Sequence, residues 1–307
     1  MHTAYITHPS YLLHNMGDWH PESPDRLRAV DDRLHAAHLF DYLVHLEATR
    51  ADRSQLLRVH DAAYIDFVEA SSPREGFHAL DPDTNMNPHT LKAAWHAAGG
   101  AAMAVDSIMR GEVGNAFVAC RPPGHHATRT QAMGFCFFNN VAVAAAHALD
   151  VHGLERVAIV DFDVHHGNGT ENIFRDDPRV MLCSTFQHPF YPFCGADTVS
   201  DHIVNVPLPA GTTGSTYREA FSTRITPSLE NFRPQMLLCS AGFDGHREDD
   251  MAQFGLVEAD YIWITEQVMA VAARHAEGRI VSVLEGGYDL SSLGRSVAAH
   301  VKTLALL

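Results

Sequence analysis

Short apolar runs that alternate with helix-length segments constrain the fold of this chain more than any other feature. Runs rich in Val and Ile predict strands at Ala4–Thr7, Ala116–Cys120, Val157–Asp161, Val180–Ser184, Ile203–Val206, Met236–Ala241 and Ile280–Leu284. Segments rich in Ala and Leu predict helices at Pro24–His38, Pro88–Arg110, Asn139–His152, Ser215–Glu230, Ala259–Ala276 and Leu290–Leu307. Apolar strands are expected where helices cover both faces of a sheet, and strand–helix alternation favours parallel crossover units. The chain is therefore predicted to adopt an α/β fold.

The first hundred residues follow a different pattern, mostly helical and loop-like, and Asp81–Pro88 (DPDTNMNP) is predicted to be a turn-rich surface loop. No low-complexity block, linker or internal repeat divides the sequence. Because α/β folds often keep a single domain beyond about 200 residues, residues 1–307 are expected to form one domain.

Composition limits the partners that this chain can have. A hydrophobic fraction of 46% and a charged fraction of 19% are typical of a soluble globular protein with a large core. The formal net charge of −15 should repel nucleic acid and anionic membranes. A cationic substrate, such as a polyamine or a Lys-rich peptide, is compatible with that charge.

The location is predicted from the amino terminus and the cysteines. The segment MHTAYITHPSYLLHN lacks the basic region and the apolar stretch of a secretory signal, and no apolar run approaches the ~20 residues that span a bilayer. Five cysteines without CxxC spacing resemble neither a zinc knuckle nor a disulfide scaffold. A reducing, cytoplasmic setting is therefore expected.

Polar, metal-capable residues follow four of the predicted strands. The four segments are Arg121–His126 (RPPGHH), Asp161–Asn168 (DFDVHHGN), Gly242–His246 (GFDGH) and Glu285–Tyr288 (EGGY). Parallel α/β sheets bind their ligands at the carboxyl ends of the strands, so these segments can converge. They would bring Asp and His for a metal, a His pair for proton transfer and a lone Tyr, which together indicate a hydrolytic metal centre.

The segment after Val157–Asp161 has the pattern of a metal site. Side chains in extended backbone alternate, so Asp161, Asp163 and His165 share one side, and Asp244 arrives from another strand. Burying such groups unpaired is costly, and a divalent cation removes the cost. Two carboxylates, one imidazole and an open position suit Zn²⁺, and less strictly Fe²⁺ or Co²⁺. The alternative is an acidic strand end with helix-capping and ion-pairing duties.

The His pair and the Tyr add candidate catalytic groups. Two prolines and a glycine before His125 and His126 predict a rigid turn that presents adjacent side chains at set angles. A carboxylate on the far nitrogen of an imidazole fixes its tautomer and raises its basicity, as a general base requires. Tyr288 can hydrogen-bond a carbonyl oxygen and its oxyanion. Taken alone, the His pair would be a surface or core feature, and Tyr288 a packing residue.

Taken together, five motifs resemble the histone deacetylase superfamily, which includes acetylpolyamine amidohydrolases and bacterial deacetylase-like amidohydrolases. RPPGHHA, GFCFFNN, DFDVHHGNGT, SAGFD and EGGY occur in the family's order and span nearly the whole chain. The motif DVHHGNGT resembles the class II branch more than class I. The resemblance implies the arginase/deacetylase-like fold, a three-layer α/β/α sandwich around a mainly parallel sheet, and a single deacetylase domain.

The resemblance also implies a ligand set and an acid–base pair. Asp163, His165 and Asp244 would bind zinc. His126 would act as general base and then general acid, and His125 would be its electrostatic neighbour.

Three further residues complete the catalytic group that the family implies. Asp161 would pair with His125, and Tyr288 would polarise the scissile carbonyl. Asn168, the partner expected for His126, stands where class I members have Asp and class II members also have Asn. This Asn should weaken the orientation and basicity of His126 but is compatible with activity.

Family members also bind monovalent cations, usually K⁺. The structural potassium site would use Asp161, Asp163, His165 and Ser184, partly through backbone carbonyls. A second site would use carbonyls around Phe174, Asp177 and Val180.

A substrate tunnel is implied by the same resemblance. Its aromatic walls would be Phe135, next to Gly134, and Tyr191. Arg26 resembles the residue that guards the cavity where released acetate resides, and Asp83 is a candidate to grip the substrate backbone.

The implied activity is zinc-dependent hydrolysis of the acetyl-lysine amide, with acylated lysine peptides or proteins as substrates. The alternative is an amidohydrolase for acetylpolyamines or other small acylated amines. Polyamine-selective relatives can carry a Glu gatekeeper seven residues after the last ligand, and here that place holds Met251, although Asp249 and Asp250 adjoin it and could attract a cation. Two less favoured readings are a weakly catalytic acyl-lysine binding protein and an arginase-type ureohydrolase, which needs a two-metal cluster.

Overall fold

The strands of the central sheet all run parallel to one another. In this computed structural model, which describes residues 2–307, the sheet order is β2-β1-β5-β10-β9-β6-β7-β8. The strands are β1 (Thr3–Thr7), β2 (Val44–Glu47), β5 (Asn115–Val118), β6 (Val157–Asp161), β7 (Val180–Gln187), β8 (Ile203–Leu208), β9 (Met236–Ala241) and β10 (Ile280–Leu284). Each of the seven predicted strands is therefore confirmed, within a few residues at its ends.

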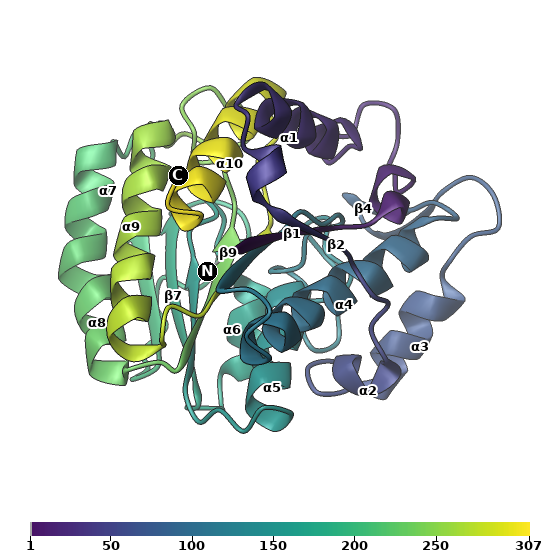
Figure 1. The fold of residues 1–307 in the computed structure, drawn as a ribbon. Coiled ribbons are helices and arrows are strands. Elements are labelled where there is room, and N and C mark those ends of the chain that lie inside the picture. Colours follow the sequence, from purple (N-terminus) through teal and green to yellow (C-terminus); the bar gives the residue numbers. More distant parts are fainter. Residues whose placement is uncertain (1) are drawn as a thin grey trace.

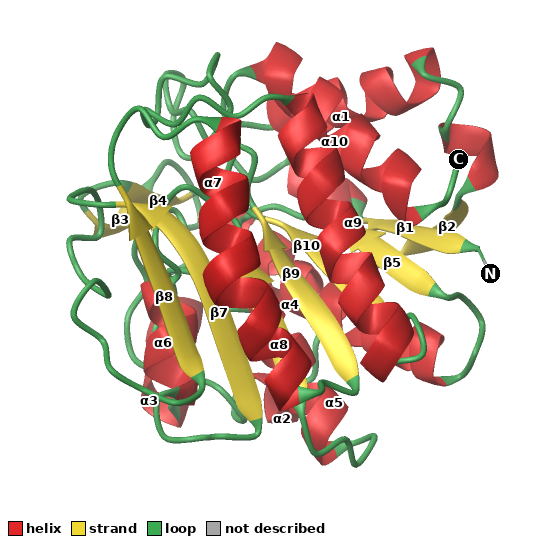
Figure 2. Cartoon of the chain, turned by 90° about the vertical axis from the view of Figure 1, so that its left-hand side faces the viewer, coloured by secondary structure: helices red, strands yellow, loops and turns green. Residues whose placement is uncertain are grey.

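Helices cover both faces of the sheet (Figures 1 and 2), which confirms the predicted three-layer sandwich. On one face lie α2 (Arg53–Leu56), α3 (Ala62–Ala70), α4 (Thr90–Met109), α5 (Asn140–Asp150) and α6 (Asn168–Phe174). On the other lie α1 (Asp25–Ala36), α7 (Gly214–Ala220), α8 (Thr226–Phe232), α9 (Glu258–His275) and α10 (Leu290–Leu304). A π-helical turn at Phe221–Ile225 joins α7 to α8, so the single helix predicted there is nearly continuous.

Most of the structure that the sequence prediction missed lies in the amino-terminal third, although helix α6 was missed as well. Strand β2 at the sheet edge was not predicted, because its four residues are only half-buried and lack an apolar run. The predicted loop Asp81–Pro88 is wrong in part, since β3 (His78–Asp81) and β4 (Thr84–Met86) form an antiparallel hairpin. The hairpin depends on a tertiary contact: the Thr84 hydroxyl accepts a hydrogen bond from the Phe135 amide (3.0 Å). A contact of this kind does not produce the alternation of apolar and polar residues from which a strand is predicted.

The sheet order decides which loops meet. Every residue of β6, β7, β9 and β10 is buried, as expected for strands between two helical layers. Because β5, β10, β9 and β6 are consecutive neighbours, the loops that follow them emerge side by side at one edge. Among residues 2–307, no helix has the length and apolar character needed to cross a membrane.

A buried histidine ties the last two helices to the sheet. His300 on α10 contacts the Thr265 hydroxyl through Nδ1 (2.6 Å) and the Ser282 hydroxyl through Nε2 (2.8 Å). Because Thr265 already donates to the Tyr261 carbonyl (2.6 Å), it accepts from Nδ1–H, which leaves Nε2 to accept from Ser282. This arrangement uses the neutral ring, and burial lowers the pKa of His300 to about 3.

We expect His300 to make the fold sensitive to acid. The pKa of this histidine is about 6.5 in the unfolded chain, so at a pH between that value and the folded pKa only the unfolded chain binds the proton. The free energy of unfolding therefore falls as pH drops below 6.5, by about 2 kcal/mol between pH 7 and pH 5. In a His300→Gln variant this part of the loss should disappear when urea unfolding is measured at both pH values. Replacing the exposed His89 by Gln should leave the wild-type dependence unchanged; equal pH dependence in all three proteins would contradict the assignment.

Candidate active site

The four polar loops predicted to converge do meet at the carboxyl edge of the sheet. They follow β5, β6, β9 and β10, and each contributes buried charged or polar side chains. The side chains of His125, Asp161, Asp163, Asp244 and Glu285 are almost completely buried there. So many ionisable groups in one buried place require mutual pairing or a bound cation.

Asp163, His165 and Asp244 form a three-sided cradle. His165 Nδ1 lies 3.1 Å from Asp163 Oδ1 and 3.1 Å from Asp244 Oδ2, and the three groups offer ligand atoms that all lie within 4.8 Å of one another. The other carboxylate oxygens are fixed by backbone amides: Gly286 donates to Asp163 Oδ2 (2.8 Å) and Val164 donates to Asp244 Oδ1 (3.0 Å). One oxygen of each carboxylate is thus held while the other faces the imidazole.

The pKa values of His165 and Asp244 indicate that this cradle stabilises a positive charge. Burial alone would lower the pKa of His165, but hydrogen bonds to Asp163 and Asp244 and their charges raise it to about 10. Burial and the charge of Asp163 raise the pKa of Asp244 to about 6. The two carboxylates thus stabilise a positive charge between them. Together with the imidazole they fit Zn²⁺, whose sites use this donor set with a position left open.

The two adjacent histidines of the β5 loop have different partners. His125 Nδ1 lies 3.0 Å from Asp161 Oδ2, and His126 Nδ1 lies 2.7 Å from Asn168 Oδ1. The turn that carries them is fixed by Glu285, whose Oε2 accepts from the amides of Gly124 (2.7 Å) and His125 (3.1 Å). Because the Asn168 oxygen accepts from Nδ1–H of His126, Nε2 of that ring is left free as a base.

The different surroundings of His125 and His126 shift their pKa values in opposite directions. Burial would lower the pKa of His125, but the charges of Asp163 and Asp161 raise it well above the ordinary histidine value. Burial and the charges of His125 and His165 lower the pKa of His126 well below that value. One ring is therefore held as a cation and its neighbour as a neutral base, an arrangement that marks acid–base roles.

Tyr288 is positioned by Asp249, a residue whose role the sequence prediction missed. The Oδ2 atom of Asp249 accepts from the amides of Tyr288 (2.6 Å) and Asp289 (3.0 Å), and Oδ1 accepts from the Met251 amide (3.0 Å). Asp249 is buried, whereas Asp250 is exposed, and attraction of a cationic substrate by these two residues stays a prediction. The bonds run to backbone amides, for which the sequence carries no signal.

Arg26 lies behind Tyr288 rather than in the tunnel. Its Nε donates to the Gly287 carbonyl (2.6 Å), NH2 donates to the Glu285 carbonyl, and its guanidinium carbon is 4.9 Å from the centre of the Tyr288 ring. Glu22 accepts from Arg26 NH1 (3.2 Å) and binds Arg121 through both carboxylate oxygens. Contact between Arg26 and released acetate stays a prediction.

A narrow cavity of about 150 Å³ leads to these groups. It is lined by Asp83, His126, Gly134, Phe135, His165, Phe190, Tyr191, Met251 and Tyr288. The predicted wall residues therefore line one cavity, together with Phe190, which the sequence prediction missed and which stacks on His165 at a centroid distance of 5.6 Å. Gly134 has a φ of +55°, and a Cβ there would lie 2.4 Å from the His126 ring.

Of the four residues predicted for potassium, Asp163 and His165 belong to the cradle itself. Asp161 and Ser184 are register partners on β6 and β7, and Asp161 Oδ1 accepts from the Asp163 amide (3.2 Å). In the second predicted site, the Phe174 carbonyl accepts from the Asp177 amide (3.0 Å) and the Asp177 carbonyl from the Val180 amide (3.1 Å). Cation binding at either place stays a prediction.

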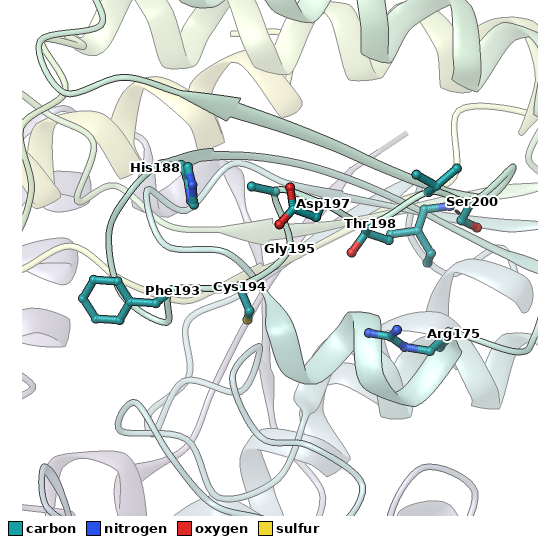
Figure 3. A pocket seen from close by; sticks show the side chains of 11 residues that line it. Arg175, His188, Phe193, Cys194, Gly195, Asp197, Thr198 and Ser200 are labelled. Carbon is teal, nitrogen blue, oxygen red and sulfur yellow. Dashed lines mark hydrogen bonds between the residues drawn. The ribbon is translucent and has the colours of Figure 1, made fainter.

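A second hollow, of about 570 Å³, is lined mainly by residues 193–200, which follow Tyr191 in the chain (Figure 3). Arg175, His188, Phe193, Asp197 and Thr198 are among its lining residues. Arg175 and Thr198 are already engaged by Glu171 (2.9 and 2.8 Å), and none of the predicted site residues lines this hollow. The narrow cavity is therefore the candidate active site.

Residues 20–304 match the family model described as "Histone deacetylase domain", and the chain belongs to the histone deacetylase family. It is 40% identical over 296 residues to the histone deacetylase-like amidohydrolase of Pseudomonas aeruginosa, covering 92% of this chain and 78% of that one. It is 38% identical over 298 residues to a probable deacetylase of Archaeoglobus fulgidus, covering 94% and 82%.

Two further comparisons concern the structure and a longer relative. The crystal structure of the HDA15 HD domain superposes with a TM-score of 0.94 at 35% identity, covering 99% of this chain and 89% of that one. The polyamine deacetylase HDAC10 of Mus musculus is 38% identical over 325 residues, covering 99% of this chain but 48% of that protein. Membership of this family, whose relatives are named as deacetylases and amidohydrolases, supports hydrolase activity for this chain.

The close approach of Gly286 to both carboxylates gives a test of the cradle. A Cβ at Gly286 would lie 2.1 Å from Asp244 Oδ2 and 2.6 Å from Asp163 Oδ2. We expect a Gly286→Ala variant to retain about one Zn²⁺ per chain fewer than the wild-type protein after dialysis, measured by atomic emission, because the two oxygens must separate. The control is Gly255→Ala, whose Cβ would meet atoms only at 3.6 Å and beyond. Circular dichroism checks that both variants fold, and undiminished zinc in a folded Gly286→Ala protein would exclude this ligand geometry.

Proposed function

We propose that this chain is a zinc-dependent deacylase that hydrolyses the amide of acetyl-lysine side chains. One observation carries the proposal: a neutral imidazole, a phenol and the His165 ring of the three-ligand cradle all line the same narrow cavity. Residues 1–307 would act as a single catalytic domain. Acylated small amines are the second candidate substrate class, favoured by the relative named as a polyamine deacetylase.

Asp163, His165 and Asp244 would hold the ion, with Zn²⁺ preferred over Fe²⁺ or Co²⁺ for this donor set. When bound there, such an ion polarises the acyl carbonyl and lowers the pKa of water. Asp161 would serve both the imidazole of His125 and, with Ser184, a structural K⁺ beneath the site.

His126 would transfer the proton in both halves of the reaction. Its free Nε2 accepts a proton from the attacking water and then returns it to the leaving amine. Asn168 keeps the ring in the required tautomer through the 2.7 Å bond to Nδ1. The cationic neighbour His125 would oppose early protonation of His126, which keeps the base available until the water is in place.

Tyr288 would stabilise the charge that develops on the acyl oxygen. The phenol donates a hydrogen bond that strengthens as the carbonyl becomes an oxyanion. Burial raises the pKa of Tyr288 well above its ordinary value, so the hydroxyl keeps the proton that it must donate. Asp249 and Arg26 would act as positioning residues for its backbone and ring.

The cavity supports a short acyl group on a linear aliphatic chain. Its volume of about 150 Å³ is small, and the rings of Phe135, Phe190 and Tyr191 line it. Aromatic walls suit the methylene groups of lysine. In the cavity lining Met251 offers no charge to a second amine, and Asp249 is hydrogen-bonded to backbone amides, which favours acyl-lysine over a polyamine. Asp83 is the carboxylate in this lining, and it would be the group that attracts a cationic substrate.

We expect a Tyr288→Phe variant to lose about 10²–10³ in kcat, equivalent to about 2.7–4 kcal/mol of transition-state stabilisation, because an oxyanion donor is removed. The measurement is steady-state turnover of an acetyl-lysine peptide by zinc-loaded protein, with bound zinc counted in the same sample. Tyr42→Phe, at an exposed tyrosine, serves as the control. Full kcat in the Tyr288→Phe variant at equal zinc content would refute the assigned role.

A rate comparison separates the two substrate classes. We expect kcat/KM for an acetyl-lysine peptide to exceed that for N-acetylputrescine by at least tenfold, because Met251 offers no carboxylate to the second amine. A Met251→Glu variant should narrow this ratio by improving the acetylputrescine rate. Preference of the wild-type protein for N-acetylputrescine would instead favour the small-amine amidohydrolase.

A further inference from the structure

A second cluster of metal-capable side chains lies away from the candidate active site. It consists of Asp106 on α4, His147 on α5 and His152 just beyond the end of α5. Helices α4 and α5 lead into β5 and β6, so their carboxyl-terminal ends lie toward the amino ends of those strands. The cluster is therefore on the edge of the sheet opposite the tunnel.

The geometry points to a transition-metal site, and we propose that Asp106, His147 and His152 bind Zn²⁺. Nε2 of His147 and Nε2 of His152 lie 2.8 and 2.7 Å from the same atom, Asp106 Oδ1. The three residues offer ligand atoms that all lie within 4.8 Å of one another. Two imidazoles and a carboxylate form a donor set of zinc sites that leave a position to water.

The metal-free distances are close to those that an ion needs. With bonds of about 2.0–2.1 Å to zinc, tetrahedral ligand atoms lie about 3.4 Å apart, so each imidazole must withdraw by about 0.6 Å. His152 lies in the turn after α5, where such a movement requires no change of a helix. The side chains of Asp106 and His152 are 29% and 19% exposed, which leaves a path for the ion and for water.

Charged neighbours set the strength of the site. Arg58 NH1 and Gln55 Nε2 lie 3.3 and 3.4 Å from Nδ1 of His147 and donate to it. A ligating Nε2 requires the proton on Nδ1, so metal binding must break these two contacts. Arg110 NH1 lies 4.0 Å from Asp106 Oδ2 and further reduces the attraction for a dication. The site is therefore weaker than the buried Asp163–His165–Asp244 cradle.

An ion here would cross-link two helices of the same layer. Asp106 belongs to α4, whereas both imidazoles belong to α5 and the turn that follows it. Helix α5 leads through that turn into β6, which ends at Asp161. The inferred role is to fix α5 against α4, because a bound ion would join Asp106 to the two imidazoles at a place that contacts neither substrate nor the tunnel.

Calorimetric titration with Zn²⁺ at pH 7.5 tests the proposal in the full chain already carrying one zinc equivalent. We expect one further equivalent for the wild-type protein, none for His152→Ala or Asp106→Asn, and tighter binding for Arg58→Met. The matched control is His275→Ala, because His275 also pairs with one carboxylate (2.7 Å to Glu230) but belongs to no such cluster among the described residues; it should keep the further equivalent.

The quantity that decides is the difference between wild type and His152→Ala. Counted as total bound zinc, including the equivalent already present, that difference should be one zinc per chain whether or not the tunnel holds an ion, so failure of the proposed function would not disturb it. Thermal unfolding of His152→Ala checks that the chain folds, and His152→Gln serves as a second variant. An equal zinc count in wild type and both folded variants, or the same loss in His275→Ala, would overturn the proposal.

Discussion

The burial of several carboxylates at one edge of the sheet is the constraint on which the rest of this structure depends. Asp161, Asp163, Asp244 and Glu285 lie out of solvent at the ends of neighbouring strands. Asp163, Asp244 and Glu285 each accept a hydrogen bond from a backbone amide of a different loop. Asp161 faces the imidazole of His125. An unpaired buried carboxylate would be strongly destabilising, so the loops are held in place by the charges that they must neutralise. The negative charge of the carboxylates that these hydrogen bonds leave uncompensated is what makes a cation fit the cradle.

The same carboxylates explain how two adjacent histidines acquire opposite character. The rings of His125 and His126 are 4.0 Å apart between centroids and come from one rigid turn. His125 faces Asp161 and Asp163, whereas His126 faces the neutral amide of Asn168. An aspartate at position 168 would pull the second ring toward the charged state, in competition with the first. The Asn therefore preserves a neutral base beside a cation, at the expense of basicity.

The strands, the fold class and the convergence of the polar loops could be predicted because each leaves a local pattern. Apolar runs ending in Asp, His or Gly mark the strand ends, and the parallel topology brings those ends together. Asp249, Phe190 and strand β2 could not be predicted in the same way. Asp249 acts through backbone amides, Phe190 gains its place only from the path of its loop, and β2 is too short and too exposed for a period to show. Arg26 was recognised by resemblance, but its contacts with the loop of Tyr288 emerge only in three dimensions.

Those contacts bear on how a tyrosine that follows two glycines can serve as a fixed hydrogen-bond donor. Glycine backbones lose much conformational entropy on ordering, so the segment Glu285–Tyr288 needs strong anchors. Asp249 accepts hydrogen bonds from the amides of Tyr288 and Asp289. Arg26 donates hydrogen bonds to the carbonyls of Glu285 and Gly287. An anion thus holds the donors and a cation holds the acceptors of one short loop, from different parts of the chain. Gly286 is required because a Cβ there would collide with both cradle carboxylates, and Gly287 is required by its φ of +122°. The flexibility of the segment is a consequence of these two requirements, and the two charged side chains remove it.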